Sequence, residues 1–516
     1  MKNHHENPAC LIPLPGGLGV SGVARFTARL ANGLAARGRH VGVILHTPTA
    51  VVPPLALPVD GRVAVFDCSD LPPIESTDPE HFIERYSAAV DQLAGGGPVS
   101  LVLGQHAGPF AVAAKLANAR NKEIRSIGVA HSDNGYDTRV LAHYEPILNA
   151  MVGVSSVLAS ALGTAMTDRI SSIERLPYGV EVPPSLATRE PMGDRPLRLL
   201  YAGRLDHRQK RVLTLPVLAA ELDRRSIAHE LTIVGDGPAA DALRSACGDT
   251  PSITLHPPAS PQTLSALLDS YDAFVLPSRF EGLSVAMLEA LAHGCIPVVT
   301  PSRSGTAEAV RAGRTGEVAD ATPDDDEDRV GLALADAIDA LRRRDLGEMS
   351  ARCRAHAAER FAIGLHIDRW IALLDRVAAD DPRSWPGNRS VLFNATGSAG
   401  TTGSVPTDAA ERFLRVINQL GGAPIAVHGA GAHTQALAEV IPQANVVCIT
   451  DDDRQRYGET MLGIPIIDPK QAAALGATRV VVSSHLHESD IWRRRSVYES
   501  QGLQVHRLYG PYSDRT

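Results

Sequence analysis

Short apolar runs of strand length recur along this chain, and each is followed by a glycine-containing turn and a stretch with helical periodicity. This order is typical of β-α-β units, whose parallel strands are buried between helices on both faces of a sheet. The sequence therefore predicts an α/β fold. In the first part of the chain the expected elements are strands over Ala9–Leu14, His40–His46, Arg62–Cys68, Val99–Leu103, Arg125–Ala130 and Met151–Val154, and a helix over Gly22–Arg37.

Two stretches interrupt this alternation and predict linkers. Val182–Pro196 is charged and contains several prolines, and Asp380–Gly403 is rich in Pro, Gly, Ser and Thr. Because a domain holds about 100–200 residues, the 516 residues predict three domains, at 1–185, 186–381 and 386–516, the last beginning near Trp385. The strands expected in the second domain are Leu197–Tyr201, Leu231–Val234, Ile253–Leu255, Ala273–Leu276 and Ile296–Val299.

The charge and cysteine content exclude several classes of protein. A formal net charge of −8 argues against nucleic acid as a partner, because proteins that grip the phosphate backbone carry basic surfaces. The six cysteines have no CxxC spacing, which favours buried thiols in a reducing compartment.

No apolar stretch reaches the ~18–20 residues of a membrane span, and the N-terminus lacks a signal peptide's apolar core. We therefore expect a soluble, cytoplasmic protein without a transmembrane segment, and nothing in the sequence opposes a homo-oligomer.

The segment FVLPSRFEGLSVAMLEALAHGCIPVVT reads as a buried strand, a loop, a helix and a second buried strand. Glu281 lies in the loop at the strand's carboxyl end, where ligands of open α/β sheets bind, and Glu289 lies about one and a half turns inside the helix. Carboxylates accept hydrogen bonds from vicinal sugar hydroxyls. The amides of Gly282, Leu283 and Ser284 at the helix start suit a phosphate or sugar oxygen. Taken alone, two glutamates at this spacing are more often surface acids.

The frame around the two glutamates resembles the E-x7-E signature of glycosyltransferase family 4, a large family of retaining enzymes with the GT-B fold. The matching residues are Glu281, Gly282, Glu289, Ala290, Gly294 and Pro297. The resemblance spans residues ~9–375 and implies two facing Rossmann-like domains with a nucleotide-diphosphate sugar as donor substrate. In that family the first Glu and the amides after it hold the donor sugar, and the second Glu holds the ribose hydroxyls. The resemblance assigns these roles to Glu281 and Glu289.

The sequence YAGRLDHRQK places two cations, Arg204 and Lys210, after a predicted strand that ends at Gly203. Arg binds phosphate bidentately and Lys adds a point charge, so the pair can neutralise a departing diphosphate without a metal ion. At this spacing alone, a surface Arg and Lys beside a turn is the plainer interpretation. The stretch resembles the family's diphosphate clamp, except that Arg211 stands where the family usually has Gly.

Glycine-rich turns follow two of the predicted strands. The turn PGGLGVSG matches neither the P-loop nor the G-x-G-x-x-G fingerprint, but it resembles the family's loop that faces the donor phosphates, which makes Gly16 and Gly17 binding candidates. The turn in LTIVGDGP resembles the family's second strand and turn, so Gly235 joins them. A turn that needs positive φ explains such glycines equally well. By the same resemblance Glu308 is expected to support the sugar site.

His131 ends the apolar run IGVAHSD and is expected at the carboxyl edge of the first sheet. A lone His there more often simply ends a strand. In this position it resembles the family's His that contacts the reacting sugar, and Asp133 and Asn134 beside it are candidates for binding acceptor hydroxyls.

The resemblance implies a retaining transfer of a sugar to a hydroxyl-bearing acceptor, with no metal, no cofactor and no enzyme nucleophile. Retaining members are thought to deliver the acceptor to the face from which the diphosphate leaves, and a phosphate oxygen takes its proton. The acidic charge balance and the absence of a basic amphipathic helix favour a soluble acceptor. Two alternatives share the donor motifs: a nucleotide-sugar epimerase or phosphorylase, and a non-catalytic nucleotide-sugar sensor.

The last part of the chain, from PIAVHGAGAHT onward, is also Rossmann-like, with a glycine turn at Gly429 and an acid after the next strand at Asp451. Thr434 replaces the third glycine of the fingerprint, so dinucleotide binding is weakly indicated. The stretch resembles small nucleotide-fold domains appended to sugar-modifying enzymes. His485, His487 and Glu488 match no zinc signature, so we expect an interaction or regulatory domain.

Overall fold

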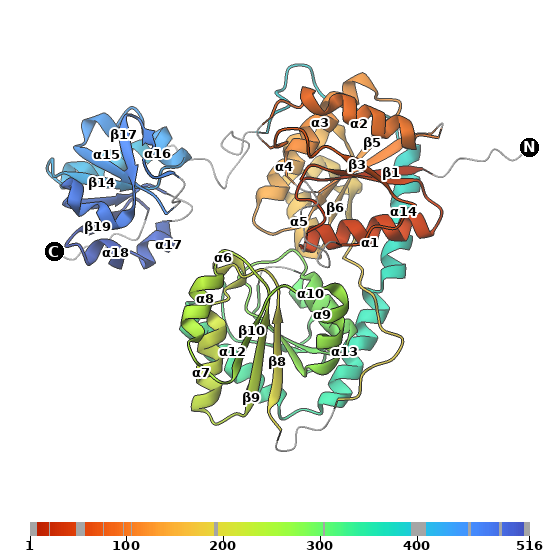
Figure 1. Cartoon of the computed structure of the whole chain (residues 1–516). Helices are drawn as coiled ribbons and strands as arrows, with labels where there is room; N and C mark the ends of the chain where they lie inside the picture. Colours follow the sequence, from red (N-terminus) through yellow and green to blue (C-terminus); the bar gives the residue numbers. More distant parts are fainter. Residues whose placement is uncertain are drawn as a thin grey trace, which may run out of the picture. The chain divides into compact units, whose positions relative to one another are not determined.

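The computed structural model describes residues 8–509 apart from positions 20, 48–56, 76, 96, 105, 190–194, 303–304, 394–408, 453–455 and 485–487. The chain divides into two compact units, Met1–Phe393 and Asn394–Thr516. The first unit contains two sheets and the second unit contains one, with helices between the strands, which confirms the α/β class (Figure 1).

The first sheet is parallel throughout and has the strand order β3-β2-β1-β4-β5-β6-β7. Its strands are β1 (Ala9–Leu14), β2 (Val41–Leu45), β3 (Ala64–Asp67), β4 (Val99–Leu103), β5 (Ile124–Ala130), β6 (Leu148–Gly153) and β7 (Ile173–Arg175). The first six confirm the expected strands to within a few residues. The polar strand β7, with sequence IER, gave no apolar signal in the sequence. The helices of this part are α1 (Gly22–Ala36), α2 (Glu80–Leu93), α3 (Gly108–Ala119), α4 (Tyr136–Tyr144) and α5 (Ser156–Ala165).

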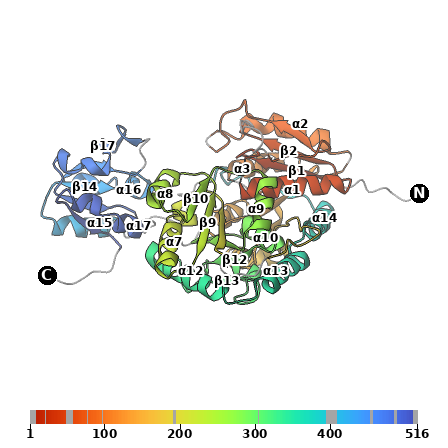
Figure 2. The ribbon, with the colours of Figure 1, turned by 60° about the horizontal axis from the view of Figure 1, so that its bottom comes forward.

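The second sheet repeats this plan with the order β10-β9-β8-β11-β12-β13. Its strands are β8 (Leu197–Ala202), β9 (His229–Val234), β10 (Ile253–His256), β11 (Ala273–Leu276), β12 (Ile296–Val299) and β13 (Glu317–Val318). Helices α7 (Thr214–Arg224) and α12 (Glu327–Leu341) cover one face, and α9 (Pro261–Ser270), α10 (Val285–Ala292) and α13 (Leu346–Arg360) cover the other (Figure 2). In each sheet the order reverses beside the first strand, between β1 and β4 and between β8 and β11, which is where open α/β sheets bind ligands.

The chain returns to the first sheet after completing the second. Helix α14 (Ile363–Ala379) packs against α1, as Figure 1 shows, and Val180 pairs with Ala362 beside it. Trp385 is buried, and its backbone N–H donates to Asn118 Oδ1 at 2.8 Å. The compact first unit therefore extends to Phe393, beyond the expected domain start near Trp385.

The second unit is a smaller sheet with the order β16-β17-β15-β14-β18-β19, parallel except for the pair β16 and β17. Its strands are β14 (Ile425–His428), β15 (Val446–Thr450), β16 (Thr460–Met461), β17 (Ile464–Ile467), β18 (Arg479–Val482) and β19 (Gln504–Arg507). Its helices are α15 (Ala409–Gln419), α16 (Ala432–Ala436), α17 (Glu488–Arg493) and α18 (Ser496–Glu499).

Candidate functional site

Lys210 and Glu281 meet at the carboxyl edge of the second sheet. Lys210 ends α6 (His207–Lys210), the short helix that follows β8, and Glu281 lies in the loop between β11 and α10. Lys210 Nζ is 2.5 Å from Glu281 Oε1, and the side chains are 18% and 7% exposed. Two further bonds fasten the loops: Arg279 N donates to Gln209 O at 2.8 Å, and Gln209 Nε2 donates to Phe280 O at 3.3 Å. Two residues that the sequence singled out separately therefore form one partly buried ion pair.

Arg204 lies at the same edge, with its side chain exposed. It makes no ion pair with another described residue, so its guanidinium is available to an anion. Its carbonyl accepts a hydrogen bond from Tyr201 Oη at 2.8 Å, which fixes the backbone where β8 ends. The Arg204 backbone is thus fixed by a hydrogen bond, whereas its guanidinium group is exposed to solvent.

Arg211 explains how this loop keeps its path without the family's usual glycine. It has φ +48°, the left-handed conformation that favours Gly. The side chain is fully buried, and its Nη2 donates to Thr322 O at 3.2 Å. Burial, and the nearby Arg279 charge, lower the pKa of Arg211 to about 10. The guanidinium therefore anchors the turn that carries Lys210.

The loop that carries Glu281 touches the first sheet directly. A Cβ added to Gly282 would lie 1.9 Å from His131 O, at the end of β5, so this position accepts no side chain. Gly305 N donates to Gly282 O at 2.8 Å, and a Cβ at Gly305 would lie 2.9 Å from Ser155 Cβ. The structure therefore brings together the Glu281-Gly282 motif and His131, which are far apart in the sequence.

The His131 ring faces inward. Its Nδ1 bonds to Tyr178 Oη at 2.7 Å, and the ring stacks on Tyr178 and meets Phe26 edge-on. Burial lowers the pKa of His131 to about 3, so the ring is neutral near pH 7. Its Nε2 is buried without a hydrogen-bond partner among the described residues and faces Gly104, where an added Cβ would lie 2.4 Å away. Nε2 is thus the ring nitrogen that has no hydrogen-bond partner among the described residues.

Asp137 holds the turn that follows His131. Its Oδ2 accepts hydrogen bonds from His131 N at 2.6 Å and from Ser132 N at 2.9 Å. Burial raises the pKa of Asp137 to about 6. Asn134, a candidate for binding acceptor hydroxyls, accepts a hydrogen bond from Tyr136 N at 3.0 Å through its side-chain oxygen Oδ1. Asp133 beside it has a partner of its own.

Glu289 is buried between helices α10 and α1. Its Oε1 accepts from Arg25 Nη1 at 2.6 Å and from Arg29 Nη2 at 2.5 Å. Its Oε2 is buried and makes no hydrogen bond with the described residues. Sequence reasoning missed both arginines. The available signal was their spacing: residues four apart on a helix share a face, and this helix follows the glycine-rich turn.

The remaining donor candidates shape the backbone at the sheet edges. Leu283 is buried, and Ser284 caps α10 by accepting a hydrogen bond from Met287 N at 3.4 Å. Gly203 N donates to Val234 O at 3.0 Å, and a Cβ at Gly235 would lie 2.0 Å from Gly203 O, so these two turns pack backbone against backbone.

Gly17 has φ +65° in the turn after β1, and Gly16 beside it is exposed. Glu308 accepts from Ser156 N and Ser156 Oγ, both at 2.5 Å, and pairs with Arg175 at 3.3 Å. Glu308 follows the second sheet's strand β12, so its bonds to Ser156, at the start of α5, and to Arg175 connect the second sheet's domain to the first.

In the second unit the glycine turn is closed by its own side chains. Ala430 N donates to Asp451 Oδ2 at 2.6 Å, and the Thr434 hydroxyl bonds to Gly429 O and Ser483 Oγ. Thr434, the residue in place of the third fingerprint glycine, is fully buried. Glu488 accepts from Leu508 N and Tyr509 N, while His485 and His487 lie outside the described residues.

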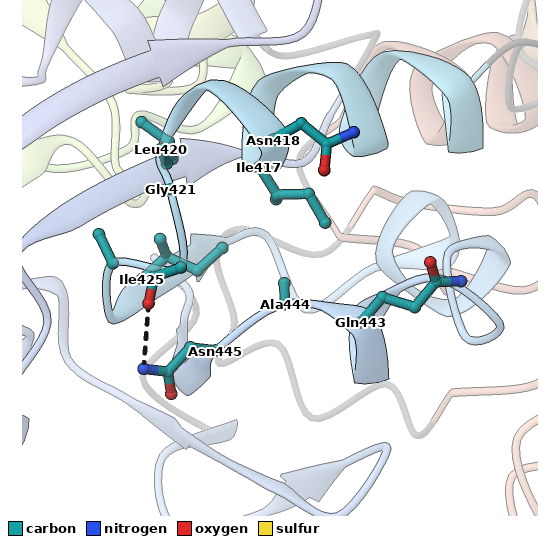
Figure 3. A pocket seen from close by; sticks show the side chains of 10 residues that line it. Ile417, Asn418, Leu420, Gly421, Ile425, Gln443, Ala444 and Asn445 are labelled. Carbon is teal, nitrogen blue, oxygen red and sulfur yellow. Dashed lines mark hydrogen bonds between the residues drawn. The ribbon is translucent and has the colours of Figure 1, made fainter.

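A cavity of about 290 Å³ lies elsewhere in this unit, lined by Ile417, Gly421, Ile425 and Asn445 among others (Figure 3). It adjoins the amino ends of β14 and β15, the edge opposite to where open α/β sheets bind ligands.

Two doubly wound parallel sheets, joined by a returning helix and meeting near the Glu281 loop, define the first unit as a GT-B fold. Residues 196–343, which form most of the second sheet's layer, match the family model described as "Glycosyl transferases group 1".

Curated relatives match over part of their length. The chain is 31% identical over 207 residues to the GDP-mannose-dependent alpha-(1-6)-phosphatidylinositol monomannoside mannosyltransferase of Mycolicibacterium smegmatis, covering 36% of this chain and 51% of the relative. It is 33% identical over 159 residues to the D-inositol 3-phosphate glycosyltransferase of Arthrobacter sp., covering 30% of this chain and 37% of the relative. The chain thus spans about half the length of these relatives, or less.

Solved structures share the fold. The sucrose-phosphate synthase of Thermosynechococcus elongatus aligns with a TM-score of 0.57 at 18% identity. The alignment covers 72% of this chain and 100% of the synthase chain. The Anabaena protein Alr3699/HepE, crystallised with UDP and glucose, aligns with a TM-score of 0.53 at 14% identity, over 71% of this chain and 99% of the Anabaena chain.

Among the described residues, no helix is both long and apolar enough to cross a membrane.

Proposed function

We propose that this chain is a retaining glycosyltransferase, which moves a sugar from a nucleotide-diphosphate donor to a hydroxyl-bearing acceptor without a metal ion. The observation that carries the proposal is the contact between Lys210 Nζ and Glu281 Oε1 at the carboxyl edge of the second sheet. It places a cation for the diphosphate beside a carboxylate for the sugar hydroxyls, within the segment that matches group 1 glycosyl transferases.

In this proposal the protein stabilises the leaving group. As the bond to the anomeric carbon breaks, negative charge grows on the diphosphate, and preorganised cations stabilise this charge strongly in a water-poor site. Lys210 and the exposed Arg204 supply two such cations. No side chain is assigned as a nucleophile, and a donor phosphate oxygen takes the acceptor's proton. The resemblance to retaining enzymes at Glu281 and Glu289 supports retention.

The His131 ring has no acid–base role in this mechanism. Its pKa of about 3 keeps it neutral at working pH, so it acts through hydrogen bonding from Nε2 once the donor sugar occupies the site. His131 O already bounds the loop at Gly282. We therefore assign His131 to sugar positioning.

The donor class follows from similar proteins. One relative's name specifies GDP-mannose, and a protein of the same fold was crystallised with UDP and glucose, so we propose a nucleotide-diphosphate hexose donor. The six cysteines are all buried free thiols, which supports a reducing, cytoplasmic environment. The acidic charge balance supports a soluble acceptor.

A two-stage experiment tests this function. Unfolding temperatures are first measured with UDP-, GDP-, ADP- and TDP-hexoses, because a ligand at 100 times its Kd adds about 2.7 kcal/mol of stability. The stabilising donor is then incubated with and without pooled polyol and glycoside acceptors. Acceptor-dependent release of nucleoside diphosphate supports the proposal. Donor epimerisation without acceptor, or binding with no turnover, would replace it by the epimerase or the sensor.

A further inference from the structure

Arg25 and Arg29 approach one oxygen of Glu289 from the opposite layer of the first unit. The arginines lie on α1, which follows β1, and Glu289 lies on α10, which follows β11. The three side chains are 11%, 21% and 8% exposed, so the cluster is largely shielded from water. Both guanidiniums donate to Oε1, at 2.6 and 2.5 Å.

The other oxygen, Oε2, is buried and has no hydrogen-bond partner among the described residues. A carboxylate oxygen accepts two hydrogen bonds, so the two arginines saturate Oε1 and leave all remaining capacity on Oε2. A buried acceptor without a donor is unfavourable, and a ligand hydroxyl placed there would satisfy it. The cluster also holds two positive charges against one negative charge.

We infer that Arg25 and Arg29 are positioning residues of the ribose subsite, which hold Glu289 so that Oε2 accepts a hydrogen bond from a ribose hydroxyl of the donor. The inference rests on the proposed function, and extends it to residues of the first sheet's layer. Because water does not reach Oε2 while α1 touches α10, the ribose must enter before this contact forms. Recognition of the ribose and closure of α1 onto α10 are then one event.

The test is the preference for ribose over deoxyribose. Calorimetric titration gives the Kd values of UDP, GDP and ADP and of their 2′-deoxy forms for the whole chain. A hydrogen bond to a charged group contributes about tenfold or more in affinity, so we expect the wild type to prefer the ribose form of its nucleotide by at least about tenfold. In R25A/R29A this ratio should fall towards about one, and R25K/R29K should recover part of it, because Lys keeps the charge without the planar fork.

Arg37→Ala is the matched control. Arg37 caps the same helix and pairs with Asp368 at the surface, where the side chains are 47% and 56% exposed, so this variant should keep the wild-type ratio. The single variants R25A and R29A give the same readout if the double variant does not fold. A purely structural role changes affinity for both forms of the nucleotide equally.

Each outcome is decisive. A ribose preference that collapses in R25A/R29A and persists in R37A supports the inference. An unchanged preference in both, or no preference in the wild type, overturns it while leaving the proposed function intact. A wild type that binds none of the three nucleotides overturns the proposed function, and the inference with it.

Discussion

Lys210 Nζ lies 2.5 Å from Glu281 Oε1, and this ion pair joins the turn after β8 to the loop after β11. The two residues come from separate β-α-β units, so their contact depends on β8 and β11 being neighbours in the sheet. The same ion pair therefore has two roles: its residues are proposed to bind the donor, and their contact stabilises the loops at the edge of the second sheet.

Lys210→Ala and Arg204→Ala should differ in stability although both lower turnover. Removing either cation should reduce kcat by about 10²–10³-fold, because a phosphate contact strengthens as charge develops. Lys210→Ala also leaves the buried Glu281 carboxylate unpaired, which should cost about 3 kcal/mol or more of unfolding free energy. Arg204 is exposed, so Arg204→Ala should unfold like the wild type. Urea unfolding and steady-state kinetics measure both effects, and the exposed Arg208→Ala in α6 is the control.

Gly282→Ala should abolish transfer through a steric clash. The added Cβ would lie 1.9 Å from His131 O, so the Glu281 loop or the end of β5 has to move. We expect a large loss of donor affinity, measured by calorimetry with the nucleoside diphosphate. Gly163→Ala is the control: this glycine lies in α5 with nothing within 4 Å of the added Cβ, and helix propensity should make it stabilising by up to about 1 kcal/mol. Normal donor binding by the Gly282 variant would disprove the tight approach.

Acid should destabilise the first unit through His131. Its folded pKa, about 3, is lowered by burial from the ordinary value of 6.5. The stability it contributes is therefore full above about pH 6.5 and lost as the pH falls towards about 3. His131→Gln should unfold with a shallower pH dependence than the wild type, by up to about 1.4 kcal/mol per pH unit. Asp137, whose pKa is raised to about 6, has the opposite dependence, but it is common to both proteins.

Urea unfolding at several pH values between about 7 and about 4 checks this slope. The exposed His81→Gln is the matched control and should follow the wild-type curve. Equal slopes for His131→Gln and the wild type would contradict the burial of the ring.

A chain ending at Phe393 should bind donor and transfer sugar, because every donor candidate lies in the first unit. A chain ending at Asp381 should be less stable, by about 3 kcal/mol or more. It lacks Trp385, which is buried and contacts the rings of His143 and Tyr144, and it lacks Val391, whose carbonyl accepts from Tyr144 Oη at 2.7 Å. Thermal unfolding compares the two truncations. A stable 1–393 chain that binds donor without transfer would assign a catalytic contribution to the second unit.

The product should keep the donor's anomeric configuration, and transfer should survive EDTA. Lys210 and Arg204 supply the positive charge that a divalent metal would otherwise place on the diphosphate. NMR of the first-formed product from an α-linked donor reports the configuration. A β-linked product, or activity lost on chelation and restored by manganese, would contradict this mechanism.

Much of the fold follows from local sequence signals. Strands β1, β4, β11 and β12 have the predicted bounds, because a buried parallel strand is a continuous apolar run between turn residues. The Ser284 cap is a local interaction of the same kind, since its hydroxyl accepts a hydrogen bond from an amide three residues away. The two-residue strand β13 and the polar strand β7 were missed. Pairing with neighbouring strands stabilises them, and their own sequences contain no continuous apolar run.

By itself the sequence determined the class of fold, the bounds of several buried strands, and the residue types from which a donor site is built. Only the tertiary structure decided which of those residues meet. It paired Glu281 with Lys210, set Gly282 against the His131 carbonyl, and placed Arg25 and Arg29 on Glu289. The physical reason is range: apolar periodicity and caps act within one element, whereas these contacts join residues from different elements and are fixed only when the helices and loops of both sheets pack together.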